Sequence, residues 1–336
     1  MSTPGTGPSL ASIHIYPLKG ARGLDLRESL VQPWGLAGDR RWLLADPAGR
    51  FISQREEPQL ARIQVRYAGP APGEGVIFIA APGRLAILVE PPRQAAGAEM
   101  VPVSVWRSEL LAAAAGPAAD EWLSDVLGRP VRLTYLDDPR RRPVDARYGA
   151  PGDVVSFADG YPLLVTSTAS LDALGKWLAD DGDEPVPMNR FRPNVVVADT
   201  DPWDEDCWRR LSIGPVSFRA VKPCGRCVVT TIDQMTAERG SQPLKMLGRR
   251  RRLGQDLVFG QNLIPDGPGV IRCGSWSGPA DPSRRPVRVI TANVRPVNFA
   301  VTPLPSMLTT TALPVAGRGL RIVLMGSDEA PFANGG

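Results

Sequence analysis

Two cysteines separated by two residues form the one motif in this sequence whose residue types suit a metal. They occur in Cys224-Gly225-Arg226-Cys227, and strand-like sequence lies on both sides of the motif. A deprotonated cysteine is a soft metal ligand and a nucleophile, and a neighbouring positive charge such as that of Arg226 favours deprotonation. The motif therefore indicates a thiolate site, whose type depends on what surrounds it.

A lone CxxC motif has three interpretations. As half of a zinc site it lacks the other half, because Cys207 and Cys273 each have no paired neighbour. As a thioredoxin-type redox pair it should begin a helix, whose dipole lowers the thiol pKa; the β-branched run 228–232 instead predicts a strand. The third interpretation is a pair of structural cysteines in a sheet, which the motif alone leaves open.

The composition narrows the chemistry further. Among 336 residues there is a single histidine, His14, which argues against His-based zinc or iron sites and against Ser-His-Asp triads. The net charge of +4 is too small for a nucleic-acid-binding protein and suits one anionic ligand better. The sequence has no signal-like N-terminus and no apolar run of about 18 residues, so we expect a cytoplasmic protein without a membrane partner.

Short apolar runs between Pro and Gly residues predict a barrel-like sheet in the first part of the chain. Residues 41–45 and 51–54 flank the turn sequence Asp46-Pro47-Ala48-Gly49 and predict a hairpin. Helices are expected at 117–127 and after a cap at Ser167 or Thr168. Further strands are expected at 194–198, 216–221 and 228–232, and Arg249 to Arg252 should form a solvated run in which Arg251 could steer an anion.

The fold class that these elements predict is mainly β (α+β), with two β-rich units and helices packed outside them. We expect the first unit at 10–135 and the second at 143–274, with the charged stretch 137–142 as the linker. After residue 275 the composition changes to Pro, Arg, Thr and Gly, with one apolar run at 320–325. The sequence does not predict the structure of this tail.

The cysteine motif does not stand alone. The stretch from Val221 to Asp233 resembles the cofactor signature of MOSC domains, closest to the branch of the mitochondrial amidoxime-reducing component and the bacterial N-hydroxylaminopurine reductases. Other segments resemble the family in the same order: Tyr16-Pro17-Leu18-Lys19, Gly38-Asp39-Arg40-Arg41-Trp42, Arg55-Glu56-Glu57-Pro58, Asn189-Arg190-Phe191-Arg192-Pro193-Asn194, Pro243-Leu244 and Phe259-Gly260-Gln261-Asn262. The resemblance implies an N-terminal β-barrel domain followed by a MOSC domain.

The resemblance also implies a bound molybdenum cofactor, Mo-molybdopterin, and a set of residues that hold it. Cys227 matches the metal ligand, which needs no histidine because the pterin dithiolene completes the sulfur set. Lys19 and Arg40 match residues that bind the cofactor phosphate, and Arg192 and Asn194 match residues that hold the pterin. Gly20 and Gly225 stand where relatives often carry Ser, so their backbone N–H groups would replace hydroxyl donors; together with Arg226 they complete the expected site. Because these residues come from both units, we expect the cofactor at the junction.

By the same resemblance, the activity is the reduction of small N-hydroxylated compounds: amidoximes, hydroxylamines and N-hydroxy nucleobases. Electrons would come from a separate reductase, a flavoprotein or a small redox protein, because the tail has no cysteine after Cys273 for a fused iron–sulfur cluster. Two alternatives stay open. One is a sulfur- or cofactor-carrier module with a persulfide on Cys227, and the other is a cofactor storage protein.

Overall fold

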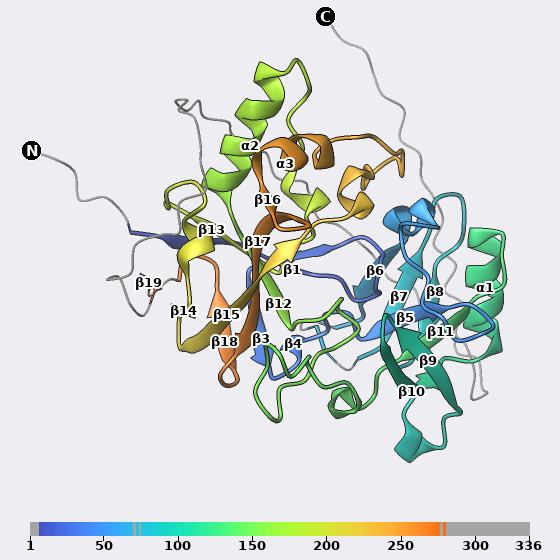
Figure 1. The fold of residues 1–336 in the computed structure, drawn as a ribbon. Helices are drawn as coiled ribbons and strands as arrows, with labels where there is room; N and C mark the ends of the chain where they lie inside the picture. Colours follow the sequence, from blue (N-terminus) through green and yellow to red (C-terminus); the bar gives the residue numbers. More distant parts are fainter. Residues whose placement is uncertain (1–6, 70–71, 74, 276–277, 280–336) are drawn as a thin grey trace, which may run out of the picture.

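The computed structural model describes residues 7–69, 72–73, 75–275 and 278–279, and strands dominate these residues. Within this part of the chain three α-helices lie outside the sheets, which confirms the mainly β fold class (Figure 1). No helix of the described part combines the length and the apolarity needed to span a bilayer. The segment after residue 279, with the apolar run 320–325, lies outside the described residues.

The largest sheet contains nine strands and is built mostly from the second half of the chain. Its order is β19 (Gly278–Pro279), β14 (Arg210–Ile213), β15 (Val216–Gly225), β17 (Asp256–Pro265), β12 (Leu163–Ser167), β13 (Val195–Ala198), β1 (Ser9–Ile15) and β2 (Leu24–Leu26), and β16 (Arg252–Leu253) pairs with β17. Strands β12 and β13 are parallel, whereas β1 joins β13 antiparallel. The first strand of the chain thus belongs to a sheet of the second half.

Three smaller sheets complete the strand structure. One has four strands, in the order β5 (Trp42–Ala45), β11 (Arg132–Tyr135), β10 (Ser108–Ala114) and β9 (Met100–Val105). The second contains β6 (Gln64–Tyr67), β7 (Ile77–Ala80) and β8 (Ile87–Val89), and the third joins β18 (Gly269–Arg272) to β3 (Glu28–Gln32) and β4 (Gly35–Leu36). The pairing of β18 with β3 is a second link between the two ends of the described chain. The unit boundaries expected at 135 and 143 stay a prediction. Strands within residues 9–36 pair with strands of the second expected unit.

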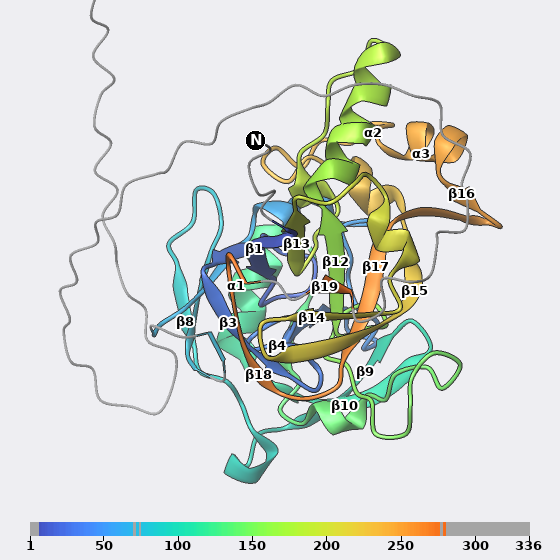
Figure 2. The same ribbon diagram turned by 90° about the vertical axis from the view of Figure 1, so that its left-hand side faces the viewer.

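The two predicted helices form where their caps and apolar spacing place them. Helix α1 (Pro117–Leu127) has Pro at its first position and ends at Gly128, whose φ of 65° suits a glycine C-cap. Helix α2 (Thr168–Asp180) begins after Ser167, whose hydroxyl accepts the Ser170 N–H. The sequence analysis missed the seven-residue helix α3 (Leu244–Arg250), which lies beside α2 in both views (Figure 2).

Separate apolar cores support the two groups of sheets. One contains Leu18, Trp42, Leu60, Leu123 and Tyr135 and fills the space between α1 and the smaller sheets. Another contains apolar side chains from β1, β12, β13, β15 and β17. Ile15 belongs to the core of the large sheet, and Leu18 belongs to the core between α1 and the smaller sheets. The segment 15–19 therefore passes directly from one core to the other.

One local prediction needs correction. The turn at 46–49 forms, with Asp46 accepting the N–H groups of Ala48 and Arg50, but the second arm makes a single bridge, Ala45 to Phe51, in place of a strand. The main partner of β5 is β11, so the expected hairpin is incomplete. The stretch expected as a linker contains a short 3₁₀ helix at Pro139–Arg141, and its role as a linker stays a prediction.

Candidate functional site

A cavity of about 140 Å³ opens where the large sheet meets the smaller ones. All eight residues that the sequence analysis assigned to a cofactor site line this cavity, although they are spread over more than 200 positions of the chain. They are Lys19, Gly20, Arg40, Arg192, Asn194, Gly225, Arg226 and Cys227. The convergence of these residues is observed, and their individual roles toward a ligand stay predictions.

Lys19 is a buried cation of this cavity, and its partner Asp159 also lines the cavity. It follows β1 at the point where the chain enters the barrel-like sheets, and 8% of its side chain is exposed. Its ammonium group lies 2.5 Å from Oδ1 of Asp159, a carboxylate whose side chain is 72% exposed. Burial lowers the pKa of Lys19 to about 8, against the opposing effect of Asp159. Asp159 also accepts a hydrogen bond of 3.2 Å from the Trp106 indole.

Two arginines meet on the ring of Tyr16. The guanidinium carbons of Arg40 and Arg192 lie 4.4 and 4.2 Å from the ring centroid. Both residues have positive φ, 48° and 54°, a conformation that costs free energy in residues other than glycine. Arg40 donates to the buried carboxylate of Asp39 at 2.6 Å and to the backbone oxygen of Arg192 at 3.2 Å. Burial lowers the pKa of Arg192 to about 10.

Asn194 lines the cavity and connects Arg40 to the large sheet. Its side chain is 1% exposed, and its Oδ1 accepts the Leu164 N–H at 3.2 Å and Arg40 at 3.1 Å. Its Nδ2 donates to the backbone oxygen of His14 at 3.1 Å. Because both ends of the amide are engaged by protein, the contacts of Asn194 orient Arg40 toward the cavity.

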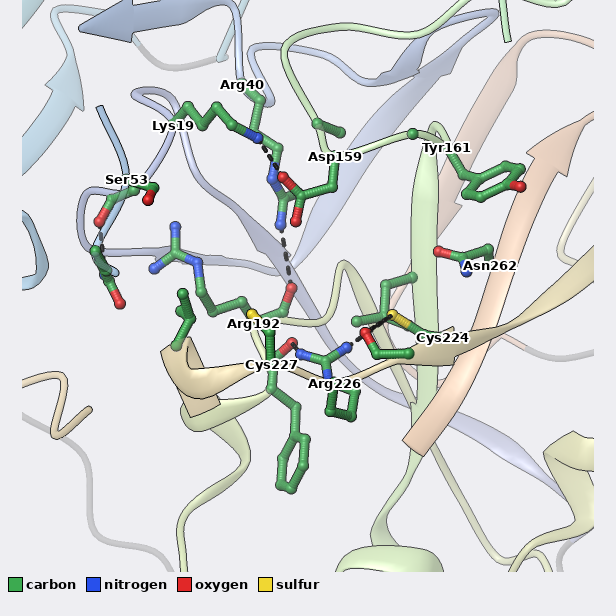
Figure 3. Close-up of a pocket in the computed structure, with 18 of the residues that line it drawn as sticks. Lys19, Arg40, Ser53, Asp159, Tyr161, Arg192, Cys224, Arg226, Cys227 and Asn262 are labelled. Carbon is green, nitrogen blue, oxygen red and sulfur yellow. Dashed lines mark hydrogen bonds and ion pairs between the residues drawn. The ribbon is translucent and has the colours of Figure 1, made fainter. Parts of the chain in front are cut away.

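The cysteine motif closes one side of the cavity (Figure 3). Cys224 and Gly225 end strand β15, and Cys227 precedes a 3₁₀ helix at Val228–Thr231. Arg226 lies between the two sulfurs, donating to Cys224 Sγ at 2.8 Å and to the Phe191 oxygen at 2.7 Å. These contacts fix the loop while Cys227 Sγ has no recorded hydrogen bond within the described residues. The thiol expected as metal ligand thus borders the cavity.

The strand predicted at 228–232 was wrong. The N–H of Thr230 bonds to the Cys227 oxygen at 3.0 Å, and the hydroxyl of Thr230 accompanies it at 2.9 Å. The Thr231 hydroxyl bonds in the same way to the Val228 oxygen at 2.8 Å. These local bonds satisfy the turn carbonyls and outweigh the β-propensity of branched residues.

The electrostatics of the cavity fit a phosphorylated, sulfur-ligated group. Its lining includes five cationic side chains and one carboxylate, Asp159. Nη2 of Arg192 and Nε of Arg226 are buried and have no hydrogen-bond partner, which is costly unless a ligand supplies an acceptor. A phosphate would satisfy the excess positive charge, and Cys227 offers the soft donor that molybdenum prefers. The carboxylate of Asp159 forms with Lys19 the kind of ion pair that a bound phosphate would form.

Several lining residues were missed by the sequence analysis. They include Asp159, Trp106, Tyr161 and Gln54, whose amide donates to the Gly20 oxygen at 2.6 Å. A signal existed for Asn262, which also lines the cavity and belongs to one of the family-like segments. The exposed Asp159 carried no local signal, since its role depends on a lysine 140 positions away.

Other candidate residues lie elsewhere. Arg251 was expected in a solvated run, but it is 1% exposed, pairs with Asp206 at 2.6 Å and does not line the cavity. His14 lies on β1 and connects Ser12 to Asp25 by hydrogen bonds of 2.8 and 2.7 Å. The Asp25 side chain is 87% exposed and His14 does not line the cavity, so this cluster lies apart from the candidate site. Within residues 7–279, masked positions aside, no group of three His, Cys, Asp or Glu side chains could form a zinc site.

Comparison with known proteins agrees with this architecture. Residues 7–130 match the MOSC N-terminal beta barrel domain, and residues 152–275 match the MOSC domain. Mitochondrial amidoxime-reducing component 1 of Mus musculus is 30% identical over 284 residues, which cover 79% of this chain and 80% of the relative. The human protein of the same name is 29% identical over 79% of this chain and 81% of its own length. Molybdenum cofactor sulfurase of Danio rerio is 29% identical over 74% of this chain but 31% of its own length. The chain therefore belongs to the MOSC family, in the form that joins an N-terminal β-barrel domain to a MOSC domain.

Proposed function

We propose that this protein is a molybdenum-cofactor-dependent oxidoreductase that reduces N-hydroxylated compounds. The observation that carries the proposal is the cavity in which Lys19, Arg40 and Arg192 face the thiol of Cys227. Membership of the MOSC family and similarity to amidoxime-reducing components support the same activity. The substrate class would include amidoximes, hydroxylamines and N-hydroxy nucleobases. We keep the cytoplasm as the predicted location, although these relatives are named mitochondrial.

Each residue of the site would have a separate task toward the cofactor. Lys19 and Arg40 would bind its phosphate, with Gly20 beside them, and Arg192 would bind the pterin through the nitrogen that has no protein partner. Cys227 would supply a thiolate to the metal, and Gly225 and Arg226 would hold the loop that carries it. When bound, the cofactor supplies the two electrons of the net reaction, in which R–NHOH, two electrons and two protons give R–NH₂ and water. A separate flavoprotein or small redox protein would return the electrons.

The decisive experiment compares two cysteine variants. Protein produced in a host that makes the cofactor should contain about one molybdenum per chain and reduce benzamidoxime with an artificial electron donor. Cys227→Ala should lose both the metal and the turnover. Cys224→Ala should retain the metal, because the Cys224 sulfur accepts a hydrogen bond from Arg226 and is not the expected ligand. Equal metal content in wild type and Cys227→Ala would refute the assignment of the ligand.

The sulfurase relatives support a second candidate, a sulfur- or cofactor-carrier module. In that case Cys227 would carry a persulfide and pass the sulfur to a partner. Mass spectrometry of the purified protein separates the candidates: a persulfide without molybdenum supports the carrier, and molybdenum without turnover supports storage. Molybdenum with turnover supports the reductase.

A further inference from the structure

One wall of the cavity has no part in the proposed cofactor binding. It contains Tyr161, Asn262 and Cys224, on the side away from Ser53 and Lys19 (Figure 3). This wall has different chemistry from the rest of the cavity, because its side chains carry no formal positive charge. Its residues come from the loop before β12, from β17 and from β15, so three separate elements build it.

Asn262 presents a fixed hydrogen-bond acceptor on this wall. It lies in β17 opposite Lys222 of β15, and its Nδ2 donates to the Lys222 backbone oxygen at 3.1 Å. This bond sets the orientation of the amide, so that Oδ1 is left on the other side. Within the described residues no protein donor is recorded for Oδ1, and Figure 3 shows the Asn262 amide beside the cavity, near Tyr161. An amide oxygen in this position selects ligands that carry an N–H or O–H group.

Tyr161 supplies an aromatic surface next to that acceptor. Its ring packs edge-on against Tyr148, with centroids 6.1 Å apart, and it also contacts the apolar cluster of Val155 and Ile264. Burial raises the pKa of Tyr161 to about 12, so its hydroxyl stays protonated at neutral pH. Lys222 lies over the Tyr148 ring at 5.4 Å and 3.9 Å from Asp256, and Arg226 donates to Cys224 Sγ and to the Phe191 oxygen, so both neighbouring cations have protein partners. The wall therefore suits an uncharged, planar ligand.

We propose that Tyr161 and Asn262 form a substrate subsite that selects uncharged aryl amidoximes and related planar N-hydroxylated amidines. The aryl ring packs against Tyr161, and Oδ1 of Asn262 accepts a hydrogen bond from the amidine nitrogen. Such compounds carry both required features, a flat apolar ring and an N–H donor beside the N–O bond. This inference rests on the proposed function, because it concerns the substrate of the same site.

The test compares an aryl substrate with one that has no ring. In Asn262→Leu, loss of one hydrogen bond should raise the KM for benzamidoxime about tenfold, given ~1–1.5 kcal/mol per bond. In Tyr161→Leu the same KM should rise about fivefold, as expected for a lost aromatic contact of ~1 kcal/mol. The KM for hydroxylamine should change less than twofold in both variants. Asn262→Gln keeps both an amide donor for the Lys222 oxygen and an amide acceptor, and it should restore the benzamidoxime KM to within about threefold of wild type.

Controls separate a failure of the subsite from a failure of the proposed function. Asn189→Leu makes the same substitution at an exposed position that does not line the cavity, and it should leave both KM values unchanged. Metal content should match wild type in every variant. Binding of benzamidoxime to the unreduced protein, measured by saturation-transfer NMR, needs no turnover. If the wild type binds but does not reduce the compound, the proposed function fails while the subsite stands; if Asn262→Leu binds as tightly as wild type, the subsite fails.

Discussion

The buried ammonium group of Lys19 gives the cofactor-free protein a distinctive pH dependence of phosphate binding. Burial lowers the pKa of Lys19 to about 8, whereas a free lysine titrates above 10. A phosphate monoester is fully dianionic above pH 7.5, because its second pKa is about 6. Between pH 7.5 and 9.5 the charge on Lys19 should therefore be the principal variable.

The expected magnitude follows from the titration curve. With a pKa of about 8, the charged fraction of Lys19 falls from about three-quarters at pH 7.5 to about 3% at pH 9.5. If binding needs the charged form, the affinity for glycerol 3-phosphate should fall on the order of 20-fold over this range. Calorimetry or phosphorus NMR can measure the affinity at each pH. Folding stability should rise over the same pH range. Above pH 8 the unfolded chain binds more protons at this lysine than the folded chain does.

The matched variant is Lys19→Arg, which keeps the positive charge throughout this pH range. Its phosphate affinity should change less than about twofold between pH 7.5 and 9.5, since the other cations of the cavity are common to both proteins. A decline of the same size in Lys19→Arg and wild type would refute the reasoning, because it would assign the titration to another group. A flat profile in wild type would refute it as well.

Three further changes test other parts of the structure. Asp159→Asn removes the carboxylate that competes for Lys19, so the affinity for glycerol 3-phosphate at pH 6 should rise about threefold by calorimetry, as expected for a largely exposed ion pair of ~0.6 kcal/mol. No rise would mean that the ion pair does not compete. Arg142→Met removes a buried guanidinium that donates to three backbone oxygens of residues 156–159, and denaturant unfolding should show a loss of about 3 kcal/mol or more, against less than 1 if these bonds contribute little. Burial raises the pKa of Glu205 to about 7. The free energy of unfolding should therefore fall by up to about 3 kcal/mol as pH rises from 4.5 to 7. Thermal unfolding of Glu205→Gln should lack this pH dependence, and a profile equal to that of wild type would contradict the prediction.

The parts of the fold that were predictable are those with local causes. Helix α1 is bounded by Pro117 and Gly128, and helix α2 by the Ser167 cap, and each of these signals acts within one helical turn. The stretch after Cys227 was not predictable from propensity, because two threonine hydroxyls bind carbonyls three residues back and stabilise a turn. The addition of β1 to the large sheet depends on pairing with β13, about 180 residues away, which no local pattern specifies.

The candidate site divides in the same way. The residues expected to hold a cofactor occur in contiguous family-like segments, and the structure brings all of them to one cavity. Asp159 and Trp106 belong to no such segment, and they take part through contacts with Lys19 and with each other. Arg251 shows the converse: a run of four arginines indicates a solvated surface, but the third one is buried against Trp203 and Asp206. Sequence patterns thus predicted the residues that line the cavity better than they predicted the groups that balance the charge of those residues.

The difference between the cations of the cavity shows which part of the site a ligand must rearrange. Arg40 and Arg192 pack on Tyr16, and Asp39, fully buried, balances Arg40, so their positions are fixed by protein groups that no ligand displaces. Lys19 instead pairs with a carboxylate whose side chain is 72% exposed and whose other partner is the Trp106 indole. Removing a largely exposed carboxylate costs little, whereas removing the Asp39 contact would leave a buried charge unpaired. The site is therefore preorganised at the two arginines and exchangeable at Lys19, and a bound phosphate should displace Asp159 while it leaves the arginine pair unchanged.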